Sequence, residues 1–156
     1  MKKVKFNIID VIVVVLLLLV VAFAGWKLAA RRSGAAEVPK VNVTYQYRVE
    51  GVAPELYENC KAYLPSPLMA AGALVGGQIE DVEKFPYYVL TDSGEWVEDP
   101  NHVTLLFTAT TTTSAANVMT TKVGDQEVRV GKTDYVLKSE FIEFSTGTIV
   151  DVKWDK

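Results

Sequence analysis

Side chains able to do nucleophilic or acid–base chemistry are few in this chain and lie far apart. It has one cysteine, Cys60, and one histidine, His102, with no motif connecting them. A thiol nucleophile needs an adjacent base, and a lone cysteine is more often a small buried apolar residue that cannot form an internal disulfide. The acidic residues show neither calcium-loop spacing nor a His-Glu-x-x-His helix. We therefore predict no catalytic residues, no metal site and no cofactor, and a chain that is not an enzyme.

Charge is distributed very unevenly. Residues 1–32 contain six basic side chains and one acidic one, whereas residues 33–156 contain ten basic and eighteen acidic ones. A basic segment suits the anionic surface of a membrane. The acidic remainder lacks the basic patch that nucleic acid requires, so we expect no nucleic-acid partner.

A long apolar run follows the basic N-terminus. Residues 11–26 read VIVVVLLLLVVAFAGW without a charge, and residues 8–26 would form about 28 Å of helix, close to the thickness of a hydrocarbon core. In lipid, a lone segment satisfies its backbone only as a helix. The sequence predicts a cytoplasmic tail at 1–7, a transmembrane helix at 8–26 in contact with the lipid bilayer, a linker at 27–40 and a single domain at 41–156.

Two other interpretations of the apolar run stay open. Residues 22–24, Ala-Phe-Ala, have the form of a signal-peptide cleavage site, but no polar break precedes them. Residues 6–11 resemble the opening of a type IV pilin, with an acid at the fifth position of an apolar helix. Against that, Lys5 stands where pilin processing requires glycine, and Gly34 and Pro39 interrupt the chain soon afterwards.

Orientation and partners both depend on the start of this segment. An outside N-terminus would take four positive charges across the membrane, so we expect the N-terminus to be cytoplasmic and the domain to lie outside a cell membrane. Asp10 would then lie about 3–5 Å into the helix, within reach of interfacial water or Lys5. Because an ionisable group in a membrane helix is a functional candidate, Asp10 is also a candidate contact with a partner helix.

The domain has the pattern of short strands. Residues 41–49 alternate between apolar and polar side chains, as in a half-buried strand, and 54–64 have helical spacing between two prolines. A Pro/Gly/Ala-rich connection at 65–77 precedes strand-like stretches at 74–83, 86–91, 103–111, 126–131, 134–139 and 147–154. The threonine-rich tail at 110–113 is either a strand end or a loop. We predict a mainly β fold: a small all-β barrel or sandwich-like domain with one short helix.

One short pattern, G-x-I-x-D-V followed by a charged residue, occurs twice. It begins at Gly77 and again at Gly147. It raises the hypothesis of two half-barrels related by a pseudo-twofold axis, in which Ile and Val, three positions apart, would point to opposite faces of a strand. Asp81 and Asp151 could then meet, although exposed carboxylates beside turns are the commoner arrangement.

Several of these segments together resemble one known family. They are FNIIDVIVVVLLLLVVAF, VTYQYRVEGV, GGQIEDVE, VGDQEVRVGK and TGTIVDVK. They are similar to the bacterial "domain of unknown function 4330" family across most of the chain. The resemblance implies a bacterial source, one membrane helix and a β domain, and it implies no reaction, ligand or catalytic residue.

Binding is the function that these features favour. Tyr87, Tyr88, Trp96 and Trp154 are candidate binding aromatics, although such residues more often pack in a core or at its rim. We expect a membrane-anchored extracytoplasmic envelope protein, a non-enzymatic binding or scaffold module for a protein or cell-wall polymer. The alternative is a subunit of a larger membrane assembly, pseudopilin-like or transporter-adaptor-like. An enzyme would need convergent acids and bases.

Overall fold

The chain forms two units, which are described separately: Met1–Val38 and Pro39–Lys156. The computed structural model describes residues 8–33 and 39–155. The first unit contains one helix, α1 (Ile8–Ser33), which continues past Trp26 into the segment assigned to the linker. Lysine, leucine, alanine and arginine at 27–32 are good helix formers, which accounts for the longer helix. In the part of the chain that the structure describes, no helix is sufficiently long and apolar to cross a membrane.

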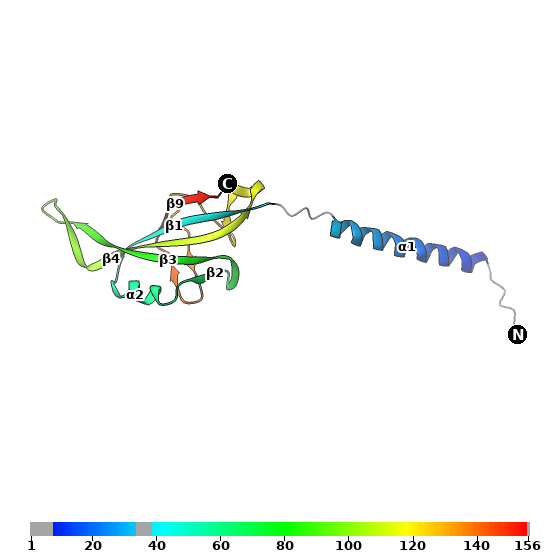
Figure 1. Cartoon of the computed structure of the whole chain (residues 1–156), viewed down its shortest axis with the longest axis horizontal. Coiled ribbons are helices and arrows are strands. Elements are labelled where there is room, and N and C mark those ends of the chain that lie inside the picture. Colours follow the sequence, from blue (N-terminus) through cyan, green and yellow to red (C-terminus); the bar gives the residue numbers. More distant parts are fainter. Residues whose placement is uncertain (1–7, 34–38, 156) are drawn as a thin grey trace. The chain divides into compact units, whose positions relative to one another are not determined.

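The second unit is built around one open antiparallel sheet (Figure 1). Its five strands, in spatial order, are β2 (Ser66–Ala70), β3 (Ala73–Leu90), β4 (Trp96–Ser114), β1 (Lys40–Val52) and β9 (Thr148–Trp154). The predicted mainly β character is confirmed. A closed barrel is not formed, because β2 and β9 lie at opposite edges of the sheet and do not pair with each other.

Shorter elements cover one face of this sheet. They are α2 (Glu55–Lys61), the 3₁₀ segment η1 (Ala115–Thr120), and two ribbons made of β5 (Lys122–Val123) with β6 (Gln126–Glu127) and β7 (Leu137–Lys138) with β8 (Glu143–Phe144). Where strands were expected at 126–131 and 134–139, the structure has only the two-residue strands β6 and β7. Two expected strands at 74–83 and 86–91 merge into β3, and the threonine-rich tail belongs to β4.

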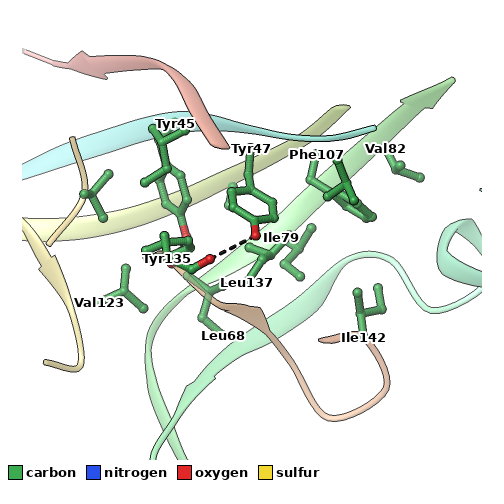
Figure 2. Close-up of a cluster of buried hydrophobic side chains, with 14 of the residues drawn as sticks. Tyr45, Tyr47, Leu68, Ile79, Val82, Phe107, Val123, Tyr135, Leu137 and Ile142 are labelled. Atoms are coloured by element: carbon green, nitrogen blue, oxygen red, sulfur yellow. Dashed lines mark hydrogen bonds between the residues drawn. The ribbon is translucent and has the colours of Figure 1, made fainter. Parts of the chain in front are cut away.

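A buried tyrosine cluster joins this covering layer to the sheet (Figure 2). Tyr45 and Tyr47 point inward from β1 because they lie on its apolar face, and Tyr135 meets them from the covering layer. The hydroxyl oxygens of Tyr45 and Tyr135 are 2.6 Å apart. The Tyr47 hydroxyl donates to the Tyr135 carbonyl oxygen at 2.9 Å and accepts from the Gly147 N–H at 2.8 Å. These hydrogen bonds position an otherwise irregular layer on the core.

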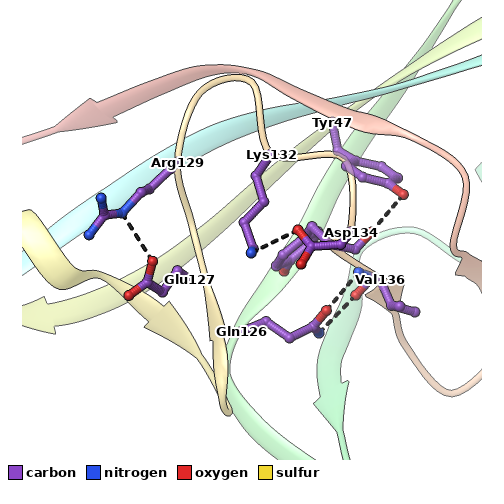
Figure 3. Close-up of polar contacts among 8 residues, drawn as sticks. Tyr47, Gln126, Glu127, Arg129, Lys132, Asp134 and Val136 are labelled. Carbon is purple, nitrogen blue, oxygen red and sulfur yellow. Dashed lines mark hydrogen bonds and ion pairs between the residues drawn. The ribbon is translucent and has the colours of Figure 1, made fainter.

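In the covering layer, hydrogen bonds between a side chain and the backbone replace part of a regular strand pairing (Figure 3). Gln126 accepts from the Val136 N–H at 2.7 Å and donates to the Val136 carbonyl oxygen at 3.1 Å, as a neighbouring strand would. Further along, Gly131 N–H donates to the Ile149 carbonyl oxygen at 2.7 Å, and Ile149 N–H donates to the Lys132 carbonyl oxygen at 3.0 Å. Two ion pairs follow the same loop, Glu127–Arg129 and Lys132–Asp134. The loop thereby covers part of the β9 edge.

The tyrosine cluster predicts a loss of stability at high pH. Burial raises the pKa of Tyr45 well above its usual value, raises the pKa of Tyr47, and raises the pKa of Tyr135 to about 12. Unfolded tyrosines ionise near pH 10, so from there to about pH 12 the unfolded chain releases protons that the folded chain keeps. The stabilisation is complete below pH 10, and its loss amounts to about 3 kcal/mol for Tyr135 alone.

We therefore expect the free energy of unfolding, measured by urea denaturation, to fall between about pH 10 and pH 12. In Tyr135→Phe the fall should be shallower, because one of the shifted groups is gone. An equally steep fall in that variant would show that the cluster does not cause the alkaline unfolding.

The two copies of the G-x-I-x-D-V pattern occupy equivalent places in the sheet. The registers are Ile79–Ala109 and Asp81–Thr108 for β3 on β4, and Ile149–Tyr47 and Asp151–Gln46 for β9 on β1. Each copy has one additional residue between these pairs, Glu80 or Val150, and so contains a β-bulge at the same point. A twofold rotation about the Gln46–Thr108 pair exchanges β1 with β4 and leaves the register between these two strands unchanged. The pseudo-twofold axis thus passes through a single sheet and does not relate two half-barrels.

The bulge reverses one expectation about side-chain direction. Ile79 and Val82 are both buried, and so are Ile149 and Val152. In a regular strand, residues three apart face opposite ways, but the additional residue of the bulge returns the second side chain to the core face. Asp81 and Asp151 do not meet, since β4 and β1 separate their strands by three spacings, about 14 Å.

Candidate functional site

A groove lies on the face of the sheet turned away from the core, and we call it the aromatic groove. It has a volume of about 530 Å³ and is lined by Phe85, Pro86, Tyr87, Tyr88, Trp96, Leu106 and Val150, with Arg48, Glu50 and Thr104 as its polar members. The register explains the convergence. Arg48 pairs with Leu106, and Phe85 pairs with Thr104, and directly opposed residues of antiparallel strands share a face.

Beyond the groove, β3 and β4 continue as a two-stranded arm, residues 87–98, seen at the left of Figure 1. Its pairs are Tyr88–Glu98, Val89–Val97 and Leu90–Trp96. The tip is a tight turn in which Gly94, at φ +82°, supplies the left-handed conformation that glycine adopts most easily. Among the described residues, β1 pairs with β4 only as far as Val103, and β2 pairs with β3 only as far as Ile79. Both outer edges of the arm are therefore open.

One face of the arm is largely apolar, with Glu98 as its charged member, and is continuous with the aromatic groove. Tyr88, Leu90 and Trp96 share this face by strand alternation and pairing. They are 50 %, 58 % and 69 % exposed. A two-stranded ribbon is marginally stable in water, and an exposed contiguous apolar face is typical of interaction surfaces. The arm therefore has the properties of a contact surface.

The base of the arm is held by a local polar turn and by packing of Tyr87. Asp99 accepts from the Asn101 N–H at 2.8 Å and lies 2.7 Å from His102 Nδ1. The Asn101 hydrogen bond and the neighbouring His102 lower the pKa of Asp99. The Tyr87 ring lies beside Gly51, where an added Cβ would come within 3.4 Å of it. Gly51 also has φ +67°, at a register shift of β1. Glycine therefore fits here both because of this backbone conformation and because it leaves room for the Tyr87 ring.

The groove and arm have an acidic rim. Arg48, the one cation lining the groove, is already paired with Glu50 at 3.0 Å. Glu83 faces the same way as Leu106, and Glu98 the same way as Tyr88, because each pair is directly opposed. Lys84 alternates to the core side, where its ammonium lies 5.0 Å from the Tyr57 ring centre. The rim thus presents more carboxylates than cations.

The pseudo-twofold axis supplies an internal comparison for the groove. Exchange of the halves carries Leu106 to Thr44, Val150 to Glu80 and Phe85 to Asp155. A second groove of about 320 Å³ lies there, lined by Asn42, Thr44, Gly77, Glu80, Thr110, Thr111, Thr112 and Asp155. Thr110 Oγ1 donates to Glu80 at 2.7 Å, so this side is a hydrogen-bonded polar surface. The same backbone therefore forms with polar residues, and the fold does not require apolar side chains in the aromatic groove.

Three of the four predicted binding aromatics come together. Tyr87, Tyr88 and Trp96 line the aromatic groove. Trp154 lies at the end of β9, and its Nε1–H donates to the Thr121 hydroxyl at 3.0 Å. Trp154 thus joins the covering layer to the sheet. Asp10 belongs to the backbone of α1, and its side chain lies outside the described residues.

The two nucleophile and base candidates lie in different environments. Cys60 belongs to α2, and its side chain is buried in the core, where burial raises the pKa of its thiol. His102 is at the base of the arm and pairs with Asp99. No group of three or more His, Cys, Asp or Glu side chains able to hold a metal ion occurs within residues 8–33 and 39–155.

Several lining residues escaped the sequence analysis. The registers of four strands bring these residues together, and they are Leu106, Val150, Phe85 and Arg48. The sequence contains a signal for one of them. Leu105 and Phe107 face the core, so strand alternation directs Leu106 to the solvent side, where a polar residue would be expected. An apolar residue on the solvent phase of a half-buried strand is informative in the same way as an exposed apolar patch.

Comparison with known proteins gives one match. The family model described as "Domain of unknown function (DUF4330)" matches residues 3–153. No curated protein and no solved structure matches the chain. Because the matched region spans nearly all 156 residues, this protein belongs to the DUF4330 family.

Proposed function

We propose that this protein is a membrane-anchored, extracytoplasmic, non-enzymatic binding module of the bacterial cell envelope, with the aromatic groove and the arm as its binding surface. One observation carries the proposal. The groove is apolar at three positions where the symmetry-related surface of the same sheet has Thr44, Glu80 and Asp155. Apolar side chains that the fold does not need, exposed beside aromatics, are the composition of a recognition surface.

The anchor is proposed from the sequence of residues 8–26. This segment is apolar except for Asp10 and follows three lysines. The described side chains at 13–21 are each about half exposed or more. Lipid would remove this surface from water. The N-terminus is proposed to be cytoplasmic, because the opposite arrangement would carry its positive charges across the membrane.

Binding accounts for the surface better than catalysis does. The groove contains aromatic rings, aliphatic side chains and one ion pair, whereas acid–base chemistry needs a positioned proton donor or acceptor beside a reacting atom. Its partner is a protein or a cell-wall polymer, and its acidic rim disfavours nucleic acid.

The second candidate is a subunit of a larger membrane assembly, pseudopilin-like or transporter-adaptor-like. The observation favouring it is Asp10, a carboxylic acid within an otherwise apolar run. Such a group finds a basic or hydrogen-bonding partner more often than it faces lipid. In that case α1 would contribute a helix–helix contact in addition to the groove.

One labelling experiment tests both location and occupancy. In a Cys60→Ala background, Val150→Cys and Phe141→Cys place single thiols at two positions, the first in the groove, where the aromatic side chains are left in place, and the second outside it. A membrane-impermeant maleimide should label Phe141→Cys in intact cells. Val150→Cys should react at least about tenfold more slowly in cells than in the purified full chain, since a bound partner excludes the reagent.

The outcomes separate the two parts of the proposal. Labelling of Phe141→Cys only after the cells are broken would overturn the outward location. Equal labelling rates for Val150→Cys in cells and in purified protein would overturn binding at the groove.

A further inference from the structure

We infer that the aromatic groove and arm bind an extended, cationic polypeptide segment that carries large apolar side chains at alternate positions. The inference rests on the binding function proposed above and names its ligand class. Three properties of the surface carry it: the sign of its charge, the open strand edges of the arm, and the spacing of its apolar side chains.

Charge complementarity selects the sign of the partner. Residues 87–98 contain three carboxylates, Asp92, Glu95 and Glu98, and no lysine or arginine. Glu83 adds a fourth carboxylate beside Leu106 on the groove face. Since Arg48 is neutralised by Glu50 at 3.0 Å, the net field over the groove is negative. An interface with this field attracts cationic partners and repels anionic ones.

The open edges of the arm select the shape of the partner. Among the described residues, Trp96, Val97 and Glu98 pair only with β3, and Tyr88, Val89 and Leu90 pair only with β4. Each edge leaves backbone N–H and C=O groups facing outward, which a further extended strand can satisfy. Strand addition of this kind draws affinity from the main chain and specificity from alternate side chains.

The apolar face selects the side chains of the partner. Tyr88, Leu90 and Trp96 project from one face of the arm, and the same face leads to Phe85 and Leu106 in the groove. A partner strand with apolar side chains at every second position places all of them on this face. Its intervening lysine or arginine side chains point to the opposite face of the arm, where the negative field of the nearby carboxylates attracts them, and a cation at the end of the apolar row can lie over an exposed aromatic ring.

Other occupants fit this surface less well. A second copy of the chain would bring two arms of the same negative charge together, which is unfavourable. An anionic lipid surface or a nucleic acid would be repelled for the same reason. A neutral glycan strand could stack on the aromatic rings, but it would make no use of the carboxylate rim or of the strand edges.

The test is a peptide selection on the full chain. The protein is purified in detergent micelles and used to select from a random dodecapeptide library displayed on phage, with empty micelles as the subtraction step. Selected peptides should be enriched in Lys and Arg, with Trp, Tyr, Phe, Val or Ile at alternate positions. A synthetic consensus peptide should bind at least about tenfold more weakly to Trp96→Ala, the usual effect of removing a central aromatic contact.

A matched set of variants separates recognition from folding. Leu106→Thr gives the groove the residue found at its symmetry-related position, so the sheet should stay intact while peptide affinity falls at least about fivefold. Phe141→Ala removes an exposed aromatic outside the groove and should change the affinity less than about twofold. Replacing the lysines and arginines of the peptide by glutamate should abolish binding.

Two results would overturn the inference, and they differ in what they say about the groove. If isolated cell-wall sacculi, but no cationic peptide, bind the full chain and release Trp96→Ala, the groove is a glycan site and the proposed binding function stands. If neither peptides nor sacculi distinguish Trp96→Ala from the unaltered chain, the ligand class and the binding function both fail.

Discussion

Replacing Gly77 by alanine is expected to lower the free energy of unfolding by about 3–5 kcal/mol, combining backbone strain with overpacking. Gly77 has φ +113°, a conformation that residues with a Cβ rarely adopt. An added Cβ would also lie 2.9 Å from Thr111 Cα and press on the Thr110 carbonyl oxygen. Both neighbours are backbone atoms of a central strand, so they cannot rotate away as the end of a side chain could.

The symmetry-related change, Gly147→Ala, should cost about 2–4 kcal/mol, mainly from overpacking. Its Cβ would lie 2.6 Å from the Arg48 carbonyl oxygen and equally close to the Tyr47 ring. Arg48 and Thr110 are exchanged by the pseudo-twofold axis, so the two glycines serve the same close approach of an outer strand to its central neighbour.

Gly76→Ala is the matched control for both changes. Gly76 precedes Gly77 directly, and its nearest neighbour to an added Cβ is Thr112 Oγ1 at 4.0 Å. Alanine there should leave stability unchanged or raise it by up to about 1 kcal/mol. Urea denaturation of the three variants measures the differences. A Gly77→Ala protein as stable as Gly76→Ala would show that the close approach is not needed.

The second large effect is expected from Ile79→Ala and Ile149→Ala, each costing about 2–5 kcal/mol, the range for deleting a core aliphatic side chain. Both isoleucines are fully buried and each immediately precedes the bulge of its pattern. The equivalence predicts costs of similar size in the two variants, although β3 is second from one edge of the sheet and β9 lies at the other edge.

Val150→Ala serves as the control for the isoleucine pair. Val150 is the bulge residue, half-buried on the groove side, and its removal leaves the core intact. We expect a loss below about 1 kcal/mol, as for most substitutions away from the core. If Ile79→Ala or Ile149→Ala leaves the thermal midpoint unchanged, the repeated pattern has no structural role.

The repeat also clarifies how a small sheet can have a specialised surface. The halves share the glycine, the bulge and two inward aliphatic residues, which serve the core and the close approach of strands. They differ on the outer face, where one half has Thr44, Glu80 and Asp155 and the other has Leu106, Val150 and Phe85. The difference is confined to positions that the core does not constrain.

Local pattern determined the parts of the fold that depend on near neighbours in the chain. The alternation at 41–49 predicted β1 and its buried face, with Val43 and Val49 inward, because side-chain direction in a strand has a period of two. The proline-bounded segment predicted α2. The pattern of short strand-like stretches predicted the mainly β character. Five segments resembled the DUF4330 family, which the match over residues 3–153 confirmed.

Only the tertiary structure decided the registers, and with them the site. A bulge adds one residue to one strand and reverses every later side chain, so the inward direction of Val82 and Val152 could not be read from spacing. Long-range pairing brought Arg48, Phe85 and Leu106 to one groove from three strands. Long-range pairing also placed Trp154 against Thr121 of the covering layer and away from the groove. The neighbours of a side chain across a sheet depend on strand order, which local periodicity does not encode.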